Sequence, residues 1–227
     1  MDKIFVPSKT TRNELTTKNV PTKKITLFTH GVDIEHFTPT KRNKTLKHFG
    51  ISDGPNLLYV EHVSREKNLH LLKETFLKLR GSHPGANLVV AKDDPYAAEM
   101  KSKLANKGAV FTNYLQNEDL AQVYASNDLF VFPNTTDTFG NVVLKAQTSG
   151  LPVIVTGQEK PRKNVTEGVT ELVMEDAYAE ELARTIEELV RNEANKLCME
   201  RTARTTMEDH SFDHAFIETW KLYHCAY

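Results

Sequence analysis

The stretch from residue 127 to residue 156 constrains the fold of this chain more than any other part of it. It reads as an apolar run at Leu129–Phe132, a polar loop, a helical segment beginning near Thr138, and a second apolar run at Val153–Val155. Gly150 lies between the helix and the second run, where a left-handed residue ends a helix at the least cost. Short continuous apolar runs are typical of strands buried on both faces of a parallel sheet. The stretch therefore predicts a right-handed βαβ unit and an α/β fold.

The loop of this unit is a candidate ligand site, because open parallel sheets bind ligands beyond the carboxyl ends of their strands. The start of the helix, at Phe139, Gly140, Asn141 and Val142, offers unpaired backbone N–H groups and the positive end of the helix dipole. These groups suit a phosphate or diphosphate, and Gly140 has no side chain to obstruct its approach. One structural alternative stays open, in which a side chain of Thr136–Asp137 only caps the helix.

Apolar runs and amphipathic segments extend the pattern over most of the chain. Further strands are predicted at 57–60, 87–91 and 109–112, and further helices at 66–80, 95–106, 118–125, 178–191, 195–208 and after Ser211. The last helix carries Phe212, Phe216, Trp220 and Tyr223 along one face. Alternating strands and helices predict a Rossmann-like parallel sheet with helices on both faces.

Composition and cysteine usage are those of an ordinary globular protein. The chain has 227 residues, of which 39% are hydrophobic and 26% charged. No apolar run approaches the roughly 18 residues of a membrane span, and the first residues do not have the layout of a secretory signal. Cys198 and Cys225 are isolated, and His210 and His214 have no evident third ligand, so no metal site is predicted. We expect a cytoplasmic protein.

Positive charge is concentrated near the N-terminus. Residues 1–50 hold ten Lys and Arg against four Asp and Glu, although the net charge of the chain is only −1. Two interpretations stay open: an ordinary solvated surface, and a face that contacts anionic lipid at the inner side of a membrane. No nucleic-acid-binding pattern is present, so we expect no nucleic-acid partner.

Three segments resemble family-4 retaining glycosyltransferases, which have two Rossmann-like domains in the arrangement called GT-B. The most specific is TDTFGNVVLKAQTSGLPV, at 136–153. LYVEHVSREKNLHLL, at 58–72, resembles the segment in which Gly-Arg follows the first strand and Glu-Lys-Asn opens the next helix. KKITLFTHGVD, at 23–33, resembles the Asn-Gly-Val-Asp junction between the domains, with His30 in place of Asn. The resemblance covers nearly the whole chain, but only the C-terminal, donor-binding half of such an enzyme.

The resemblance implies three parts. Residues 1–30 are expected to be the end of an N-terminal domain and the junction, 31–210 a Rossmann-like domain that binds a nucleotide sugar, and 211–227 a crossover helix. The acceptor-binding half would then be missing from this chain. We therefore expect a separate N-terminal domain, or self-association, to cover the exposed surfaces.

The resemblance also implies an activity and roles for individual residues. The enzyme would transfer a sugar from a nucleoside-diphosphate sugar to a glycan or lipid acceptor with retained configuration, without a metal or other cofactor. Lys67 and His62 would bind the diphosphate, and Asp137 would lie near the donor sugar. The helix start at 139–142 would act through backbone N–H groups, and Lys145 would lie beside the ribose.

Several of these positions depart from the family pattern. His62 replaces an Arg, Glu61 replaces a Gly, Asp137 replaces a Glu, and Lys145 replaces the second Glu of the signature. A lysine has only hydrogen-bond donors, so it cannot accept bonds from ribose hydroxyls as that Glu would. An alternative therefore stays open: a degenerate, non-catalytic module that binds a nucleotide or a partner protein.

Overall fold

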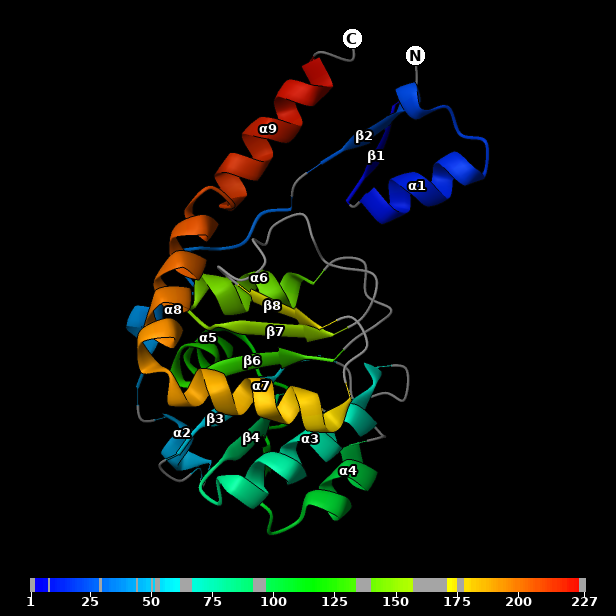
Figure 1. Ribbon diagram of the computed structural model, residues 1–227. Coiled ribbons are helices and arrows are strands. Elements are labelled where there is room, and N and C mark those ends of the chain that lie inside the picture. The colour runs from blue at the N-terminus through cyan, green and yellow to red at the C-terminus, as the bar shows by residue number, and fades with distance from the viewer. Residues whose placement is uncertain are drawn as a thin grey trace.

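The structure is a computed structural model, and it describes residues 3–7, 9–28, 30–43, 45–49, 51, 54–61, 67–91, 97–133, 140–156, 171–174 and 178–224. Within these ranges the chain forms a six-stranded parallel sheet flanked by helices and a separate two-stranded parallel sheet (Figure 1). The predicted α/β class, with helices on both faces of a parallel sheet, is confirmed.

The larger sheet has the strand order β5–β4–β3–β6–β7–β8, and every neighbouring pair is parallel. Its strands are β3 (Asn56–Tyr59), β4 (Asn87–Val90), β5 (Ala109–Phe111), β6 (Leu129–Phe132), β7 (Val153–Thr156) and β8 (Glu171–Met174). The strands predicted from the apolar runs are all present, because both faces of the sheet are covered and the strand residues are apolar without alternation.

Helices connect these strands and extend beyond them. They are α2 (Thr45–His48), α3 (Leu69–Ser82), α4 (Ala97–Leu104), α5 (Asn117–Ser126), α6 (Asn141–Thr148), α7 (Ala179–Arg191), α8 (Glu193–Glu208) and α9 (Phe212–His224), with 3₁₀ turns η1 (Thr22–Lys24) and η2 (Pro39–Lys41). Helix α6 starts at Asn141 rather than near Thr138, and residues 134–139 lie outside the described part.

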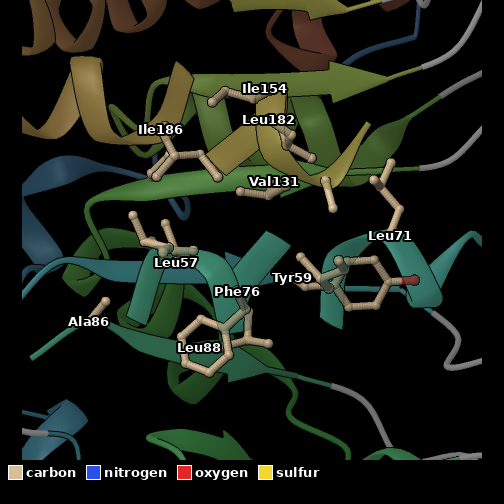
Figure 2. Packing of buried hydrophobic residues seen from close by; sticks show 14 of the residues in the cluster. Leu57, Tyr59, Leu71, Phe76, Ala86, Leu88, Val131, Ile154, Leu182 and Ile186 are labelled. Carbon is tan, nitrogen blue, oxygen red and sulfur yellow. The ribbon is translucent and has the colours of Figure 1, made fainter. Parts of the chain in front are cut away.

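The hydrophobic core lies in two layers, one on each face of the larger sheet. On one face Leu57, Tyr59 and Val131 pack with α3 and α7 (Figure 2). On the other face the next residues along the same strands, such as Leu58 and Phe130, pack with α5 and α6. Burial of one such large side chain stabilises the fold by about 1.5–3 kcal/mol, so both helix layers are held firmly against the sheet.

The N-terminal residues form a small unit of their own. It is a βαβ unit made of strand β1 (Ile4–Val6), helix α1 (Lys9–Thr17) and strand β2 (Ile25–Leu27), and its two strands pair in parallel. The unit lies beside α9, away from the larger sheet (Figure 1). The ring of Phe5 in β1 stacks on that of Tyr223 in α9, with ring centroids 5.0 Å apart. Strand β1 therefore has a partner strand in β2.

Part of the core comes from residues 31–43, called the junction segment below, and from Ile51, although the sequence there shows little regular pattern. Val32, Phe37 and Ile51 are buried with the α5–α6 layer. The Val32 N–H donates to the His210 carbonyl at 2.9 Å, beside a bridge between Val32 and Ser211. The junction and the α8–α9 connection thus run side by side.

Gly150 closes α6, and its backbone gives a first testable prediction. Its φ is +76°, and a Cβ there would lie 2.9 Å from Cγ of Pro39. Gly150→Ala should therefore lower the free energy of unfolding by at least about 1–2 kcal/mol. Gly81→Ala is the matched control, because a Cβ on Gly81 meets nothing within 4 Å. That change in α3 should be neutral or stabilise by up to about 1 kcal/mol. Urea denaturation measures both, and equal effects would contradict the prediction.

Candidate functional site

The connections that leave β3 and β6 diverge at one edge of the sheet. The two strands are parallel neighbours, with Leu57 beside Leu129 and Leu58 beside Phe130. From the carboxyl end of β3 the chain goes to α3 on one face, and from that of β6 it goes to α6 on the opposite face. Such a reversal of strand order opens a crevice outside the carboxyl ends, which is where open α/β sheets bind ligands.

The start of α3 forms one side of this crevice. Lys67 is half-buried and directly precedes Asn68, the N-cap residue. Asn68 has a left-handed backbone, with φ 50° and ψ 37°, and its carbonyl accepts from the Leu71 N–H at 3.0 Å. Asparagine tolerates this conformation better than other non-glycine residues. Non-glycine residues with a left-handed backbone are concentrated at ligand sites.

The start of α6 forms the other side. Gly140 is buried and is the N-cap, and its carbonyl accepts from the N–H groups of Val143 at 2.8 Å and Leu144 at 3.1 Å. A Cβ on Gly140 would lie 2.8 Å from Cγ2 of Val143, so a larger residue here would have to displace that side chain. No side-chain oxygen caps the helix within the described part of the chain. Its first N–H groups and the positive end of its dipole are thus suited to an anion.

A row of aromatic rings packs beside α6. The Nζ of Lys145 lies 5.1 Å from the centroid of the Phe37 ring, a cation–π distance. Phe37 meets Tyr124 of α5 edge to face at 5.6 Å, and Tyr124 stacks at 5.9 Å on Phe130 of β6. Phe130 stacks at 6.1 Å on Phe132, at the carboxyl end of β6. The row therefore connects the junction segment to the edge of the crevice.

The hydroxyl of Tyr124 is a buried polar group within this row. Tyr124 is fully buried, and its oxygen has no hydrogen-bond partner among the described residues. Burial raises the pKa of Tyr124 well above its ordinary value, and the carboxylate of Glu61 raises this pKa further. Glu61 follows β3 at the carboxyl edge of the sheet, so the hydroxyl lies within the electrostatic reach of a charge at this edge.

Some of the predicted site residues lie in the described part of the chain, and others lie outside it. Lys67 and Gly140 lie at the same edge of the sheet, Asn141 is exposed on the first turn of α6, and Val142 is half-buried beside it. Lys145 lies one turn further along, against Phe37. His62, Asp137 and Phe139 fall outside the described residues.

Phe37 and Tyr124 are the residues that the sequence analysis missed at this site. Each is an isolated aromatic residue outside any strand pattern, and their contact joins positions far apart in the sequence. The one local signal for Phe37 in the sequence was its position, four residues after the motif that ends at Asp33.

Two general features of the described residues bear on the class of site. No group of three or more His, Cys, Asp and Glu side chains among them is placed to hold a metal ion. No described helix has the length and apolar character needed to cross a membrane.

Tyr124→Phe tests whether the buried hydroxyl is unsatisfied. Removing an unpaired buried hydroxyl should raise the free energy of unfolding at pH 7 by about 1 kcal/mol. Because the pKa of Tyr124 is raised in the folded state, the wild-type protein should lose stability above the ordinary tyrosine pKa of about 10, where only the unfolded state ionises. The variant lacks this loss, so its advantage should grow with pH. Urea denaturation at pH 7 and pH 10.5 measures it, and a variant less stable at pH 7 would show that the hydroxyl has a partner.

Comparisons with known proteins agree with this geometry. The family profile described as glycosyl transferases group 1 matches residues 41–206. The sulfoquinovosyl transferase SQD2 of Arabidopsis thaliana is 38% identical over 135 residues, which cover 58% of this chain and 26% of that protein. A GDP-mannose-dependent alpha-mannosyltransferase of Mycobacterium tuberculosis is 33% identical over 174 residues, which cover 76% of this chain and 44% of that protein.

Among solved structures, the Anabaena protein HepE in complex with UDP superimposes with a TM-score of 0.88 at 16% identity. The match covers 99% of this chain and 64% of that one, and it shows a shared fold. The chain spans less than half the length of the two curated relatives described above, at 26% and 44%. Because the family profile matches well over half of its residues, the chain belongs to the glycosyl transferases group 1 family.

Proposed function

We propose that this chain is the C-terminal, sugar-donor-binding half of a retaining glycosyltransferase of family 4. The observation that supports the proposal is that α3 and α6 follow the carboxyl ends of two neighbouring parallel strands, β3 and β6. One helix start carries a lysine, Lys67, and the other begins at Gly140, where no side chain caps the helix within the described part of the chain. A cation and a helix N-terminus facing one crevice suit the diphosphate of a nucleotide sugar.

In the proposed reaction the bond between the anomeric carbon and the diphosphate oxygen breaks, and a bond from an acceptor hydroxyl oxygen to the same carbon forms. The proton of that hydroxyl passes to the leaving diphosphate. Negative charge grows on the leaving diphosphate as the first bond breaks. Lys67 and the N–H groups of α6 would stabilise that charge in the transition state, assisted by His62 when it is protonated. Asp137 would bind the donor sugar. No metal is required, because these groups supply the positive charge that a metal would otherwise provide.

The nucleotide is proposed to be UDP or GDP, the two that appear in the names of the relatives. Its ribose would lie near Lys145, whose ammonium can donate a hydrogen bond to a hydroxyl oxygen but cannot accept one. The acceptor is proposed to be a glycan or lipid, at the cytoplasmic side of a membrane. The Lys- and Arg-rich first 50 residues favour a face near anionic lipid headgroups.

A second function has specific support: binding of a nucleotide without sugar transfer. Glu61 places a carboxylate at the end of β3, near where a diphosphate would lie. Lys145 replaces the acceptor that the family uses for the ribose and contacts Phe37. Tight nucleotide binding without turnover, in a protein complete with an acceptor-binding half, would select this alternative over the enzyme.

A thermal-shift screen of nucleoside diphosphates tests the proposed site. Saturation at 100 times Kd stabilises the folded state by about 2.7 kcal/mol, so UDP or GDP should raise the Tm clearly. Lys67→Met should reduce this shift strongly, because it removes a cation facing the phosphates.

Lys78→Met, near the other end of α3, is the matched control and should leave the shift unchanged. Its amine makes an exposed contact with Glu180 at 3.6 Å, which contributes little to stability. Equal responses of the two variants would refute the role of Lys67, and no shift with any nucleotide would refute the site.

We also propose that α9 and the β1–α1–β2 unit pack against the acceptor-binding half. In α9, Phe216 is 66% exposed and Trp220 54% exposed, and their rings stack with centroids 6.0 Å apart. Phe212, Ile217 and Tyr223 are exposed as well. The β1–β2 sheet has only two strands, which is marginal without further neighbours. Contiguous exposed apolar surface of this kind marks an interface.

This chain expressed alone should therefore self-associate as its concentration rises, and β1, α1 and β2 should exchange amide hydrogens faster than β3 and β6. Light scattering and hydrogen exchange measure the two effects. Trp220→Ser should shift the equilibrium towards monomer, whereas Leu197→Ser, an exposed leucine on α8, should not. A strict monomer with a strongly protected N-terminal unit would contradict the proposal.

A further inference from the structure

Arg204, in α8, holds three backbone carbonyls with one end of its guanidinium group. Its Nη1 donates to the carbonyl oxygens of Ile34 at 2.9 Å, Phe37 at 3.1 Å and Thr148 at 3.0 Å. The first two belong to the junction segment, and Thr148 is the last residue of α6. One side chain thus ties together α8, the junction segment and the helix whose start faces the crevice.

The junction segment is shaped so that its carbonyls meet this guanidinium. Asp33 begins a turn in which its carboxylate oxygen accepts from the His36 N–H at 2.8 Å, and its carbonyl accepts from the Phe37 N–H at 2.9 Å. No helix continues from this turn to use the carbonyls of Ile34 and Phe37, because the next helical turn, η2, starts at Pro39. Helix α6 likewise ends at Thr148, so the negative ends of two backbone segments meet one positive charge.

The position of Phe37 follows from this arrangement. Its carbonyl is bonded to Arg204, and its ring lies under the ammonium of Lys145. Lys145 and Thr148 are three residues apart in α6, so the two contacts lie on neighbouring positions of one helix face. The guanidinium therefore sets the distance between the Phe37 ring and this face of α6.

We propose that Arg204 is a positioning residue for the sugar-donor site: it fixes the 33–37 turn against α6, so that Phe37 holds the Lys145 ammonium in place for the nucleotide. The proposal rests on the proposed function, since it takes Lys145 to face the nucleotide. It goes beyond that function by linking the site to the junction and to α8.

Arginine is suited to this position and lysine is not equivalent. All three bonds come from Nη1, which carries two N–H groups, so one N–H is shared between two carbonyls, and the rigid, permanently charged guanidinium plane holds this nitrogen between the segments. An ammonium keeps the charge and has three donors, but its nitrogen lies one bond closer to the backbone on a flexible stem, so it does not reach the same point between the three carbonyls. Arg204→Lys should therefore rescue only part of what Arg204→Met loses.

The first arm of the test needs no ligand. Protons on Cε of a lysine that lies over an aromatic ring are shifted upfield in the NMR spectrum, and Lys145→Arg identifies the signal by its disappearance. Phe37→Leu should abolish the upfield shift. Arg204→Met should abolish it too, Arg204→Lys should leave an intermediate shift, and Arg201→Met, an exposed arginine one turn away on α8, should leave it unchanged.

The second arm measures UDP and GDP binding by calorimetry in a double-mutant cycle. Arg204→Met should weaken binding about threefold to tenfold in the wild-type background, as coupled neighbours do. In the Lys145→Met background it should change Kd by less than about twofold, because its effect passes through Lys145. A purely structural role would instead lower the Tm and weaken binding equally in both backgrounds.

The outcomes separate the two proposals. An unchanged Lys145 signal in Arg204→Met, or equal losses of affinity in both backgrounds, would overturn the role of Arg204 while leaving the sugar-donor site intact. Absence of binding by the wild-type protein would overturn the sugar-donor site and the role assigned to Lys145 there. Loss of the shifted signal together with non-additive binding would support both.

Discussion

The pairing of β3 with β6 is the constraint on which the rest of this structure depends. Right-handed crossovers place a helix on one face when successive strands are added in one direction, and on the other face when the direction reverses. The chain adds β4 and β5 on one side of β3, then returns to add β6 on the other. The starts of α3 and α6 therefore lie at one edge of the sheet but on opposite faces, and the crevice between them follows from strand order.

Helix α6 is supported by the junction segment, which belongs to no strand or long helix. Phe37, in the junction segment, packs under α6 and continues into the aromatic row that ends at Phe132. Arg204 binds the same segment from α8. The junction is therefore a component of the core as well as a connection. A displacement of the junction segment would also displace α6, because close-packed interiors transmit displacement rather than absorb it.

The N-terminal unit and α9 differ from the larger sheet in how little apolar surface they bury. A two-stranded sheet with one short helix buries too little apolar surface to be stable by itself, and the stacking of Phe5 on Tyr223 couples it to α9. The outer face of α9 keeps its large aromatic side chains in solvent. These surfaces fit the proposed packing against an acceptor-binding half, whereas the six-stranded sheet has buried clusters of its own on both faces.

The sequence by itself determined the strands at 57–60, 87–91, 109–112, 129–132 and 153–155, the helices between and after them, and the edge at which Lys67 and Gly140 lie. The reason is that apolar runs, helical periodicity and crossover handedness are local or nearly universal rules. The order of the strands across the sheet came from the structure. Helix starts were less well determined: α3 begins at Leu69 instead of 66, and α6 at Asn141 instead of Thr138. Only the tertiary structure decided that Arg204 binds the carbonyls of Ile34, Phe37 and Thr148, and that Phe37 lies under Lys145. The physical reason is that backbone carbonyls occur at every residue, so no sequence pattern marks the three that a distant guanidinium will reach once the chain has folded.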